Sequence, residues 1–252
     1  IRLYGDRPLP SIYGPAFLDP EALLARATAS WPLHQRFVAQ RLAALAAAVL
    51  LVFAIPRMRR AVWALHPFIL FECAAGGHND VFMLLAVAGA IRLRNVIPAG
   101  IAFGVAILVK ASAAAAIFVR PRLLFGAVVV IAGFAIVQPS AFDLRLVLEH
   151  MRSPVYSALL TPLFHRFGLV PALPFLRIAV VLALFAAFVA MRKHRRDRAI
   201  PLALAIVAIP PLTTPWYGLW VAFAGVWAHR RAFTLAWWVP AILWPLYLVY
   251  WY

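Results

Sequence analysis

Five consecutive residues, Gly76-Gly77-His78-Asn79-Asp80, place three polar side chains between two apolar segments. The glycines allow a tight turn. A histidine beside a carboxylate can bind an anion, hold a hydroxyl group or move a proton. Asn79 or Asp80 could instead cap the next helix by accepting its free N–H groups. Capping does not explain three polar residues together, so we expect His78, Asn79 and Asp80 to contact a substrate.

Lys110 is one of only two lysines and lies inside the apolar run from Val105 to Val119. An ionised side chain within a membrane segment is costly and by default marks a functional site. An ammonium group there would suit a phosphate. The alternative is that its long side chain reaches back to the interface. We expect Lys110 to face the same cavity as His78 and Asp80.

Two further segments carry candidate groups. Thr213-Thr214-Pro215-Trp216-Tyr217 stands between two apolar runs, where Pro215 breaks a helix. Trp216 and Tyr217 are candidate substrate contacts, although both residue types gather at membrane interfaces for other reasons. Glu72, eight residues before Asp80, is costly in an apolar segment unless it is paired with an arginine or protonated.

Acidic and basic residues in two polar stretches are weaker candidates. Any of Asp6, Asp19 and Glu21 could act as a base, and a solvated loop is the simpler interpretation of each. In the second stretch Arg145, Glu149 and Arg152 share one face of a helix by their spacing. A surface row of ion pairs is the default interpretation there, and contact with a phosphate or sugar is the alternative.

The composition of the chain indicates what kind of fold positions these residues. The chain is 65% hydrophobic and 13% charged, with a mean hydropathy of +0.90. A soluble domain is about 45–50% apolar and about 25% charged, so 252 residues leave too little polar surface to cover a water-facing globule. The single Cys73 excludes a disulfide within the chain, and its apolar neighbours predict a buried, inert thiol. We therefore expect an all-α, polytopic transmembrane bundle.

The net charge of +16 does not indicate a nucleic-acid partner, because the arginines form short clusters between apolar runs. Such clusters are typical of cytoplasmic turns, whereas a nucleic-acid-binding protein gathers its charge on one polar face. The clusters lie at 57–60, 92–94, 120–122, 192–198 and 230–231.

About 8–10 membrane segments are expected, given that a span needs about 20 residues. The candidates are 38–56, 61–76, 79–91, 96–109, 111–119, 123–139, 171–191, 199–213, 215–228 and 232–252. If all arginine clusters are cytoplasmic, the 25 residues between Arg94 and Arg120 must leave and return. Half that length reaches only about 19 Å as a helix. A pair of short helices within 96–119 is therefore predicted, meeting near Lys110 and Ala111 inside the protein.

This topology gives one membrane domain over 1–252. It divides into an outer-face loop at 1–37, a first helical group at 38–139, an outer-face stretch at 140–170 and a second helical group at 171–252. Most acidic residues then fall on or near the outer side, which indicates a partly acidic outer cavity; they are Asp6, Asp19, Glu21, Glu72, Asp80, Asp143 and Glu149.

Several of these pieces together resemble a known family. Its motifs in chain order are Tyr13-Gly14-Pro15, His66-Pro67, Gly76-Gly77-His78-Asn79-Asp80, Lys110 and Thr214-Pro215-Trp216-Tyr217. The pattern is similar to bacterial membrane mannosyltransferases of the GT-C superfamily, over most of the chain. Its most specific part is the Gly-His-Asn-Asp turn followed 30 residues later by a membrane lysine.

The resemblance implies transfer of a sugar, mannose, from a polyprenyl-phosphate donor to a glycan or glycolipid acceptor. Transfer would occur with inversion and without a metal or cofactor, at the outer face of the bacterial inner membrane. In this family a carboxylate early in the first outer loop is the base. Because the chain starts at Ile1 within what resembles the end of that loop, the base is expected upstream, and Asp6 is the nearest candidate here.

Two alternatives stay open at this point. One is a transporter or flippase of a lipid-linked substrate, which would also place ionisable residues in a membrane cavity. The other is a truncated, inactive homologue.

Overall fold

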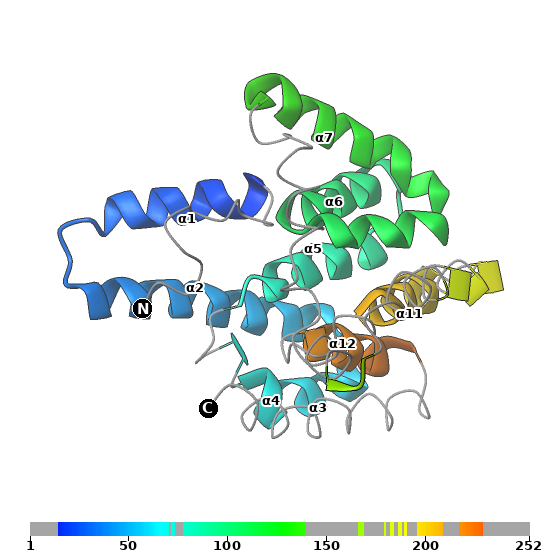
Figure 1. Ribbon diagram of the computed structural model, residues 1–252, viewed down its shortest axis with the longest axis horizontal. Coiled ribbons are helices and arrows are strands. Elements are labelled where there is room, and N and C mark those ends of the chain that lie inside the picture. Colours follow the sequence, from blue (N-terminus) through cyan, green and yellow to red (C-terminus); the bar gives the residue numbers. More distant parts are fainter. Residues whose placement is uncertain are drawn as a thin grey trace.

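A computed structural model describes residues 15–70, 72–73, 78–139, 166–168, 179, 182–183, 186–187, 189–190, 196–208 and 217–228. These residues are mostly helical and include no β-strand, so the predicted all-α class is confirmed for them. Figure 1 shows helices α5 and α6 at the centre, with α2, α7, α11 and α12 around them. The predicted segment 232–252, nearly all of 140–170 and most of 171–191 lie outside the described residues.

The predicted loop over 1–37 is wrong in part, because residues within it are helical. Helix α1 runs from Pro15 to Ala27, and α2 begins at Leu33. The charged residues of this stretch indicated a loop, but Glu, Ala, Leu and Arg are also the best helix formers. The two helices form a hairpin that projects from the rest of the molecule (Figure 1).

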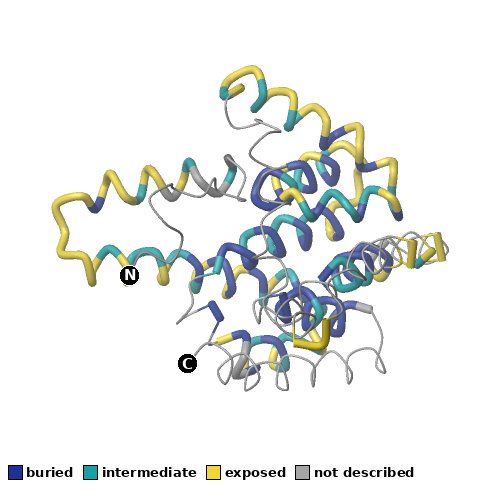
Figure 2. Tube along the Cα trace, in the orientation of Figure 1, coloured by how far each residue is buried: buried dark blue, intermediate teal, exposed yellow. Residues whose placement is uncertain are grey.

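Helix α2, Leu33–Ala54, is the only described helix long and apolar enough to cross a membrane. Shorter apolar helices cover Val96–Val109, Pro121–Val137, Arg198–Ala208 and Gly218–Trp227. Helix α2 is mostly exposed along its first half and buries Ala44, Ala47, Ala48 and Leu51 in its second (Figure 2).

The predicted span 61–76 is not one helix. Its described part contains α3 (Arg60–Ala64) and α4 (Pro67–Leu70), and the 3-10 helix η1 (Arg57–Arg59) comes just before it. Pro67 disfavours helical backbone at the residue before it, and α3 ends at Ala64 accordingly. Hydropathy alone does not register this break, because the apolar run continues across it.

The predicted pair of short helices is confirmed. Helix α5 runs from Asp80 to Arg92, α6 from Val96 to Val109, and the 3-10 helix η3 from Ala111 to Phe118. Lys110 separates the last two with extended backbone, at φ −151° and ψ 112°. A single non-helical residue therefore turns the chain back, and its side chain leaves from the junction.

Helices α6 and α7 pack backbone to backbone. After the 3-10 helix η4 (Pro121–Leu123), α7 runs from Leu124 to Val137. A Cβ on Gly100 would lie 2.7 Å from the Leu123 carbonyl oxygen, and one on Gly126 would lie 2.5 Å from that of Ile97. Only glycine allows this approach. Residues near the start of α6 lie against residues near the start of α7, so the two helices run in the same direction.

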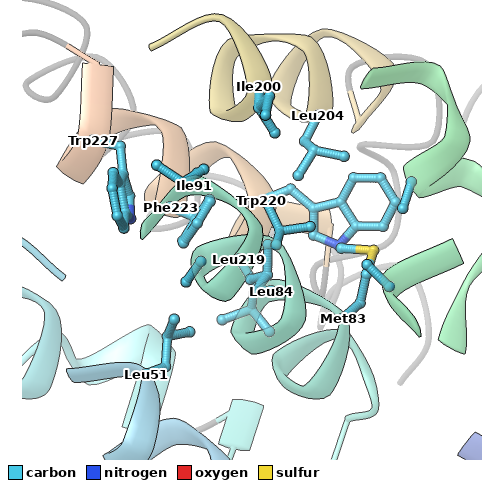
Figure 3. Packing of buried hydrophobic residues seen from close by; sticks show 14 of the residues in the cluster. Leu51, Met83, Leu84, Ile91, Ile200, Leu204, Leu219, Trp220, Phe223 and Trp227 are labelled. Carbon is cyan, nitrogen blue, oxygen red and sulfur yellow. The ribbon is translucent and has the colours of Figure 1, made fainter. Parts of the chain in front are cut away.

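Helices α11 (Arg196–Ala208) and α12 (Gly218–Ala228) complete the core. Figure 3 shows Trp220, Phe223 and Trp227 of α12 packed among residues of α2, α5 and α11. The ring of Phe223 lies 5.6 Å from that of Trp227 and 6.1 Å from that of Trp63. The tryptophans at 63, 220 and 227 are thus buried in packing rather than placed in an exposed belt.

Arginines from separate clusters meet at one end of the bundle. Arg92, the last residue of α5, donates to the Ala54 carbonyl at 2.8 Å and stacks over Trp227 at 5.4 Å. Arg59 donates to the Val226 carbonyl, and Arg60 donates to the carbonyls of Phe53 and Ile55. We call this the arginine end. Asp80 lies about 18 Å away along α5, at 1.5 Å per residue.

Candidate functional site

Asp80 and Lys110 form a buried ion pair at the opposite end of α5. The Lys110 ammonium nitrogen Nζ lies 2.8 Å from Oδ1 of Asp80. Asp80 is 0% exposed and Lys110 is 3% exposed. Asp80 is the first residue of α5, and Lys110 is the junction of α6 and η3. The two residues predicted to meet do so, although they are buried together rather than open to a cavity as we expected.

Helix α12 contributes an aromatic wall to this pair. The Trp220 indole N–H donates to Oδ1 of Asp80. The Lys110 ammonium lies 4.4 Å from the Tyr217 ring centroid and 5.1 Å from that of Trp220. The two rings meet edge to face at 5.2 Å. A cation over aromatic faces is stabilised further when it is desolvated, so the Lys110 ammonium is held by both charge and ring contacts.

Tyr217 is only 8% exposed, which places it in the site rather than in a lipid-facing belt. Trp220 is the residue that sequence reasoning missed, since it was assigned to packing or to an interfacial belt. The signal that could have found it is the spacing from Tyr217, because residues three apart share one face of a helix.

Asn79 does not cap α5, so the capping interpretation is wrong for this residue. Its backbone is helical, at φ −67° and ψ −16°, and its side chain makes no cap hydrogen bond. Asn79 is 3% exposed, and both its amide nitrogen and its amide oxygen lack a partner in the described part of the chain. Oδ2 of Asp80 is in the same state. Buried polar atoms normally find partners, so the hydrogen-bonding capacity of these atoms is not used by the described residues.

A second pair lies beside the first in the sequence. His78 Nε2 is 3.0 Å from Glu72 Oε2, and the His78 backbone N–H donates to the Glu72 carbonyl at 3.3 Å. The His78 side chain is 27% exposed and that of Glu72 only 4%. Glu72 is therefore paired, as one of the sequence interpretations required, and the partner seen among the described residues is His78. This pair is the part of the site that reaches the surface.

Other predicted residues take no part in the described geometry. Asp6, Trp216 and the two glycines at 76 and 77 lie outside the described residues, as do Arg145, Glu149 and Arg152. Asp19 lies in α1, where its Oδ1 accepts from the Gln138 amide at 3.3 Å. Cys73 is buried at 1% exposure, as predicted. Within the described ranges, no three His, Cys, Asp or Glu side chains gather in a way that would hold a metal.

The chemistry of the arrangement follows from its charge. Asp80 and Lys110 neutralise each other, and an ion pair out of water holds together only while both partners stay. An anion that reaches Lys110 must compete with Asp80 for the ammonium. A hydroxyl group that reached the atoms of Asn79 and Asp80 without a partner among the described residues would not have to displace a charge.

Residues 7–147 match the family model MptA_B, described as the N-terminal domain of alpha-(1->6)-mannopyranosyltransferase. The match includes Asp80 and Lys110, whereas Tyr217 and Trp220 lie beyond it. Searches of curated proteins and of solved structures gave no match. The matched residues make up more than half of the 252, so the chain belongs to the alpha-(1->6)-mannopyranosyltransferase family through this N-terminal domain.

Proposed function

We propose that this protein transfers mannose from a polyprenyl-phosphate donor to a glycan or glycolipid acceptor at the outer face of the bacterial inner membrane. Membership of a mannosyltransferase family supports the general activity. The GT-C class and the lipid donor are proposed from the sequence resemblance. The membrane face is proposed from the placement of the arginines. The observation that carries the proposal is the buried Asp80–Lys110 pair, which lies within the family match.

A polytopic membrane domain over 1–252 is supported by composition and by the two ends of the bundle. Helix α2 is long enough to span, and the shorter apolar helices would cross only part of the bilayer or require it to thin locally. Arginines gather at one end and the Asp80 site lies at the other. Because arginine-rich turns face the cytoplasm, we place the arginine end inside and the site outside.

In the proposed reaction, an acceptor hydroxyl oxygen forms a bond to the anomeric carbon of the sugar. The bond from that carbon to the phosphate oxygen breaks with inversion, and the electron pair leaves with the lipid phosphate. The hydroxyl proton passes to a carboxylate base, for which Asp6 is the nearest candidate in this chain. Preorganised cations are most effective where charge grows in the transition state, and Lys110 is the cation suited to the phosphate.

The remaining site residues are assigned as substrate contacts. His78 is a partly exposed polar group two residues before Asp80, and the Asn79 amide has no partner among the described residues. Tyr217 holds the Lys110 ammonium in place, and Trp216 precedes it in the chain. Asp80 orients Lys110 and must share it with an incoming phosphate.

The proposal is tested with membranes that contain the protein, a labelled polyprenyl-phosphate mannose and a glycolipid acceptor. We expect label in the acceptor and release of lipid phosphate in equal amounts. Nucleotide-linked mannose, supplied to sealed vesicles instead of the lipid donor, should give no product. Use of the nucleotide donor alone would contradict the proposal, as would movement of a lipid-linked substrate across vesicles without consumption of donor. The latter result would establish the transporter alternative.

A further inference from the structure

The α1–α2 hairpin encloses a groove remote from the Asp80 site. Its volume is about 240 Å³. It is lined by Leu24 and Ala25 of α1 and by Leu33, Arg36, Phe37 and Gln40 of α2. Figure 2 shows that the hairpin around it is largely exposed. The groove thus combines apolar walls with one guanidinium and one amide.

The residues that line the groove include one arginine, Arg36, and no aspartate or glutamate. No aspartate or glutamate occurs from Ala22 to Phe71, although Arg26, Arg36 and Arg41 all lie in that range. On α1, Asp19 accepts a hydrogen bond from Gln138, the residue after α7. Among the side chains that the structure describes, no carboxylate forms an ion pair with Arg36. An anionic group is therefore the complement that this groove lacks.

The apolar part of the hairpin matches the edge of a bilayer. Leu33 is 66% exposed, Phe37 is 52% exposed and Trp31, at the turn, is 48% exposed. They lie at the first turns of α2, the one described helix long enough to cross a membrane. Tryptophan and exposed apolar side chains beside arginine are typical of the headgroup level of a membrane.

We propose that the α1–α2 groove binds an anionic glycerophospholipid. The Arg36 guanidinium would hold the headgroup phosphate, and the Gln40 amide would donate to a phosphate or glycerol oxygen. An acyl chain would follow Leu33 and Phe37 toward the hydrocarbon. Charge-assisted bonds from arginine to phosphate are strong and directional. The bound lipid fixes α1, which contacts α6, and this role does not depend on the proposed sugar transfer.

The test counts lipids bound to the whole protein in a neutral detergent by native mass spectrometry. The probes are phosphatidylglycerol, phosphatidylcholine and a polyprenyl phosphate. We expect one phosphatidylglycerol per chain to bind in preference to phosphatidylcholine, with Arg36→Gln weakening it about fivefold or more. Ala25→Trp, which fills the groove without changing charge, should weaken it as well. Arg41→Gln, an exposed arginine on the same hairpin, is the matched control and should change binding less than about twofold.

Three results would overturn the proposal. One is that Arg36→Gln and Ala25→Trp bind phosphatidylglycerol as the unaltered protein does. A second is an equal loss in Arg36→Gln and Arg41→Gln, which would show a diffuse surface potential. The third is binding of polyprenyl phosphate alone at Arg36, which would assign the groove to another lipid. The unfolding temperature of each variant in the same detergent verifies that the protein is folded.

Discussion

The two ends of helix α5 hold their neighbours by different means. At Asp80 a fully buried carboxylate is bonded by the side chains of Lys110 and Trp220. At Arg92 an exposed guanidinium is bonded to the main-chain carbonyl of Ala54 and lies over Trp227. A buried charge is expensive once its partner is removed, whereas an exposed charge returns to water at little cost. We therefore expect loss of a single charge at the Asp80 end to cost more than loss of one at the arginine end.

Packing near the arginine end also depends on backbone more than on side chains. Gly100 and Gly126 lie near the first residues of α6 and α7, close to Arg94 and Arg122 in the chain. A side chain at either glycine would not fit, so this contact fixes the spacing and the relative direction of α6 and α7 without any polar group. Chemistry is thus concentrated at the other end, where polar side chains from α5, the α6–η3 junction and α12 converge.

The largest effect is expected for removal of one member of the ion pair. Asp80→Ala or Lys110→Ala should lower the free energy of unfolding by about 3–5 kcal/mol, because the remaining charge is left buried alone. The double variant Asp80→Leu/Lys110→Met removes both charges and should come within about 1 kcal/mol of the unaltered protein. Unfolding of the purified protein in mixed detergent micelles measures all three. If both single variants lowered the free energy of unfolding by less than about 1 kcal/mol, the expected difference between the two ends of α5 would be contradicted.

The second-largest effect is expected for loss of the hydrogen bond that the Trp220 indole donates to Asp80. Trp220→Phe keeps an aromatic ring under Lys110 but removes the hydrogen bond to Asp80. Trp63→Phe is the control, since its indole nitrogen is equally buried and has no hydrogen-bond partner among the described residues. A hydrogen bond to a charged group contributes about 1.5–3 kcal/mol, so Trp220→Phe should cost that much more than Trp63→Phe. Equal losses in the same micelle assay would remove Trp220 from the site.

A smaller effect is expected at the glycine contact. Gly100→Ala places a Cβ 2.7 Å from the Leu123 carbonyl and forces α6 and α7 apart, which should cost about 1–3 kcal/mol. Gly133, also in α7, has nothing within 4 Å of its Cβ position. Gly133→Ala should therefore stabilise by about 0.5–1 kcal/mol through the usual preference of helices for alanine. Opposite signs of the two changes, measured by unfolding, are the expected result, and a loss at both positions would contradict the backbone contact.

The smallest effect belongs to the arginine end. Arg92→Ala removes one exposed hydrogen bond and one cation–π contact, for an expected loss of about 1 kcal/mol or less. The same unfolding assay checks this value. A loss as large as that of Asp80→Ala would show that both ends are equally dependent on their charges.

Much of the helical framework could be predicted from hydropathy and arginine placement. The bounds of α6 were predicted as 96–109 and found there, because arginines mark its start and Lys110 interrupts the apolar run at its end. The short length between Arg94 and Arg120 also predicted that Lys110 would turn back toward Asp80. These inferences succeed because they use local composition and the rise of a helix per residue.

What could not be predicted depends on contacts between distant residues or on competition between local signals. Trp220 is 140 residues from Asp80, and only its spacing from Tyr217 could have indicated that it belongs to the site. Glu72 lies against His78, six residues later in the chain, a pairing that the sequence interpretation did not consider. Helix α1 was missed because our interpretation gave hydropathy more weight than helix propensity. The break before Pro67 was missed because hydropathy does not reflect the backbone restriction that proline imposes on the residue before it.

The most direct test is the rate of mannosyl transfer by Lys110→Gln in membranes, given labelled polyprenyl-phosphate mannose and normalised to inserted, folded protein. Glutamine can still bond to Asp80 but carries no charge to stabilise the departing phosphate. Loss of one such group costs about 100-fold or more in rate, and we predict that loss. Transfer at the unaltered rate would show that the buried pair is structural and that the chemistry lies elsewhere.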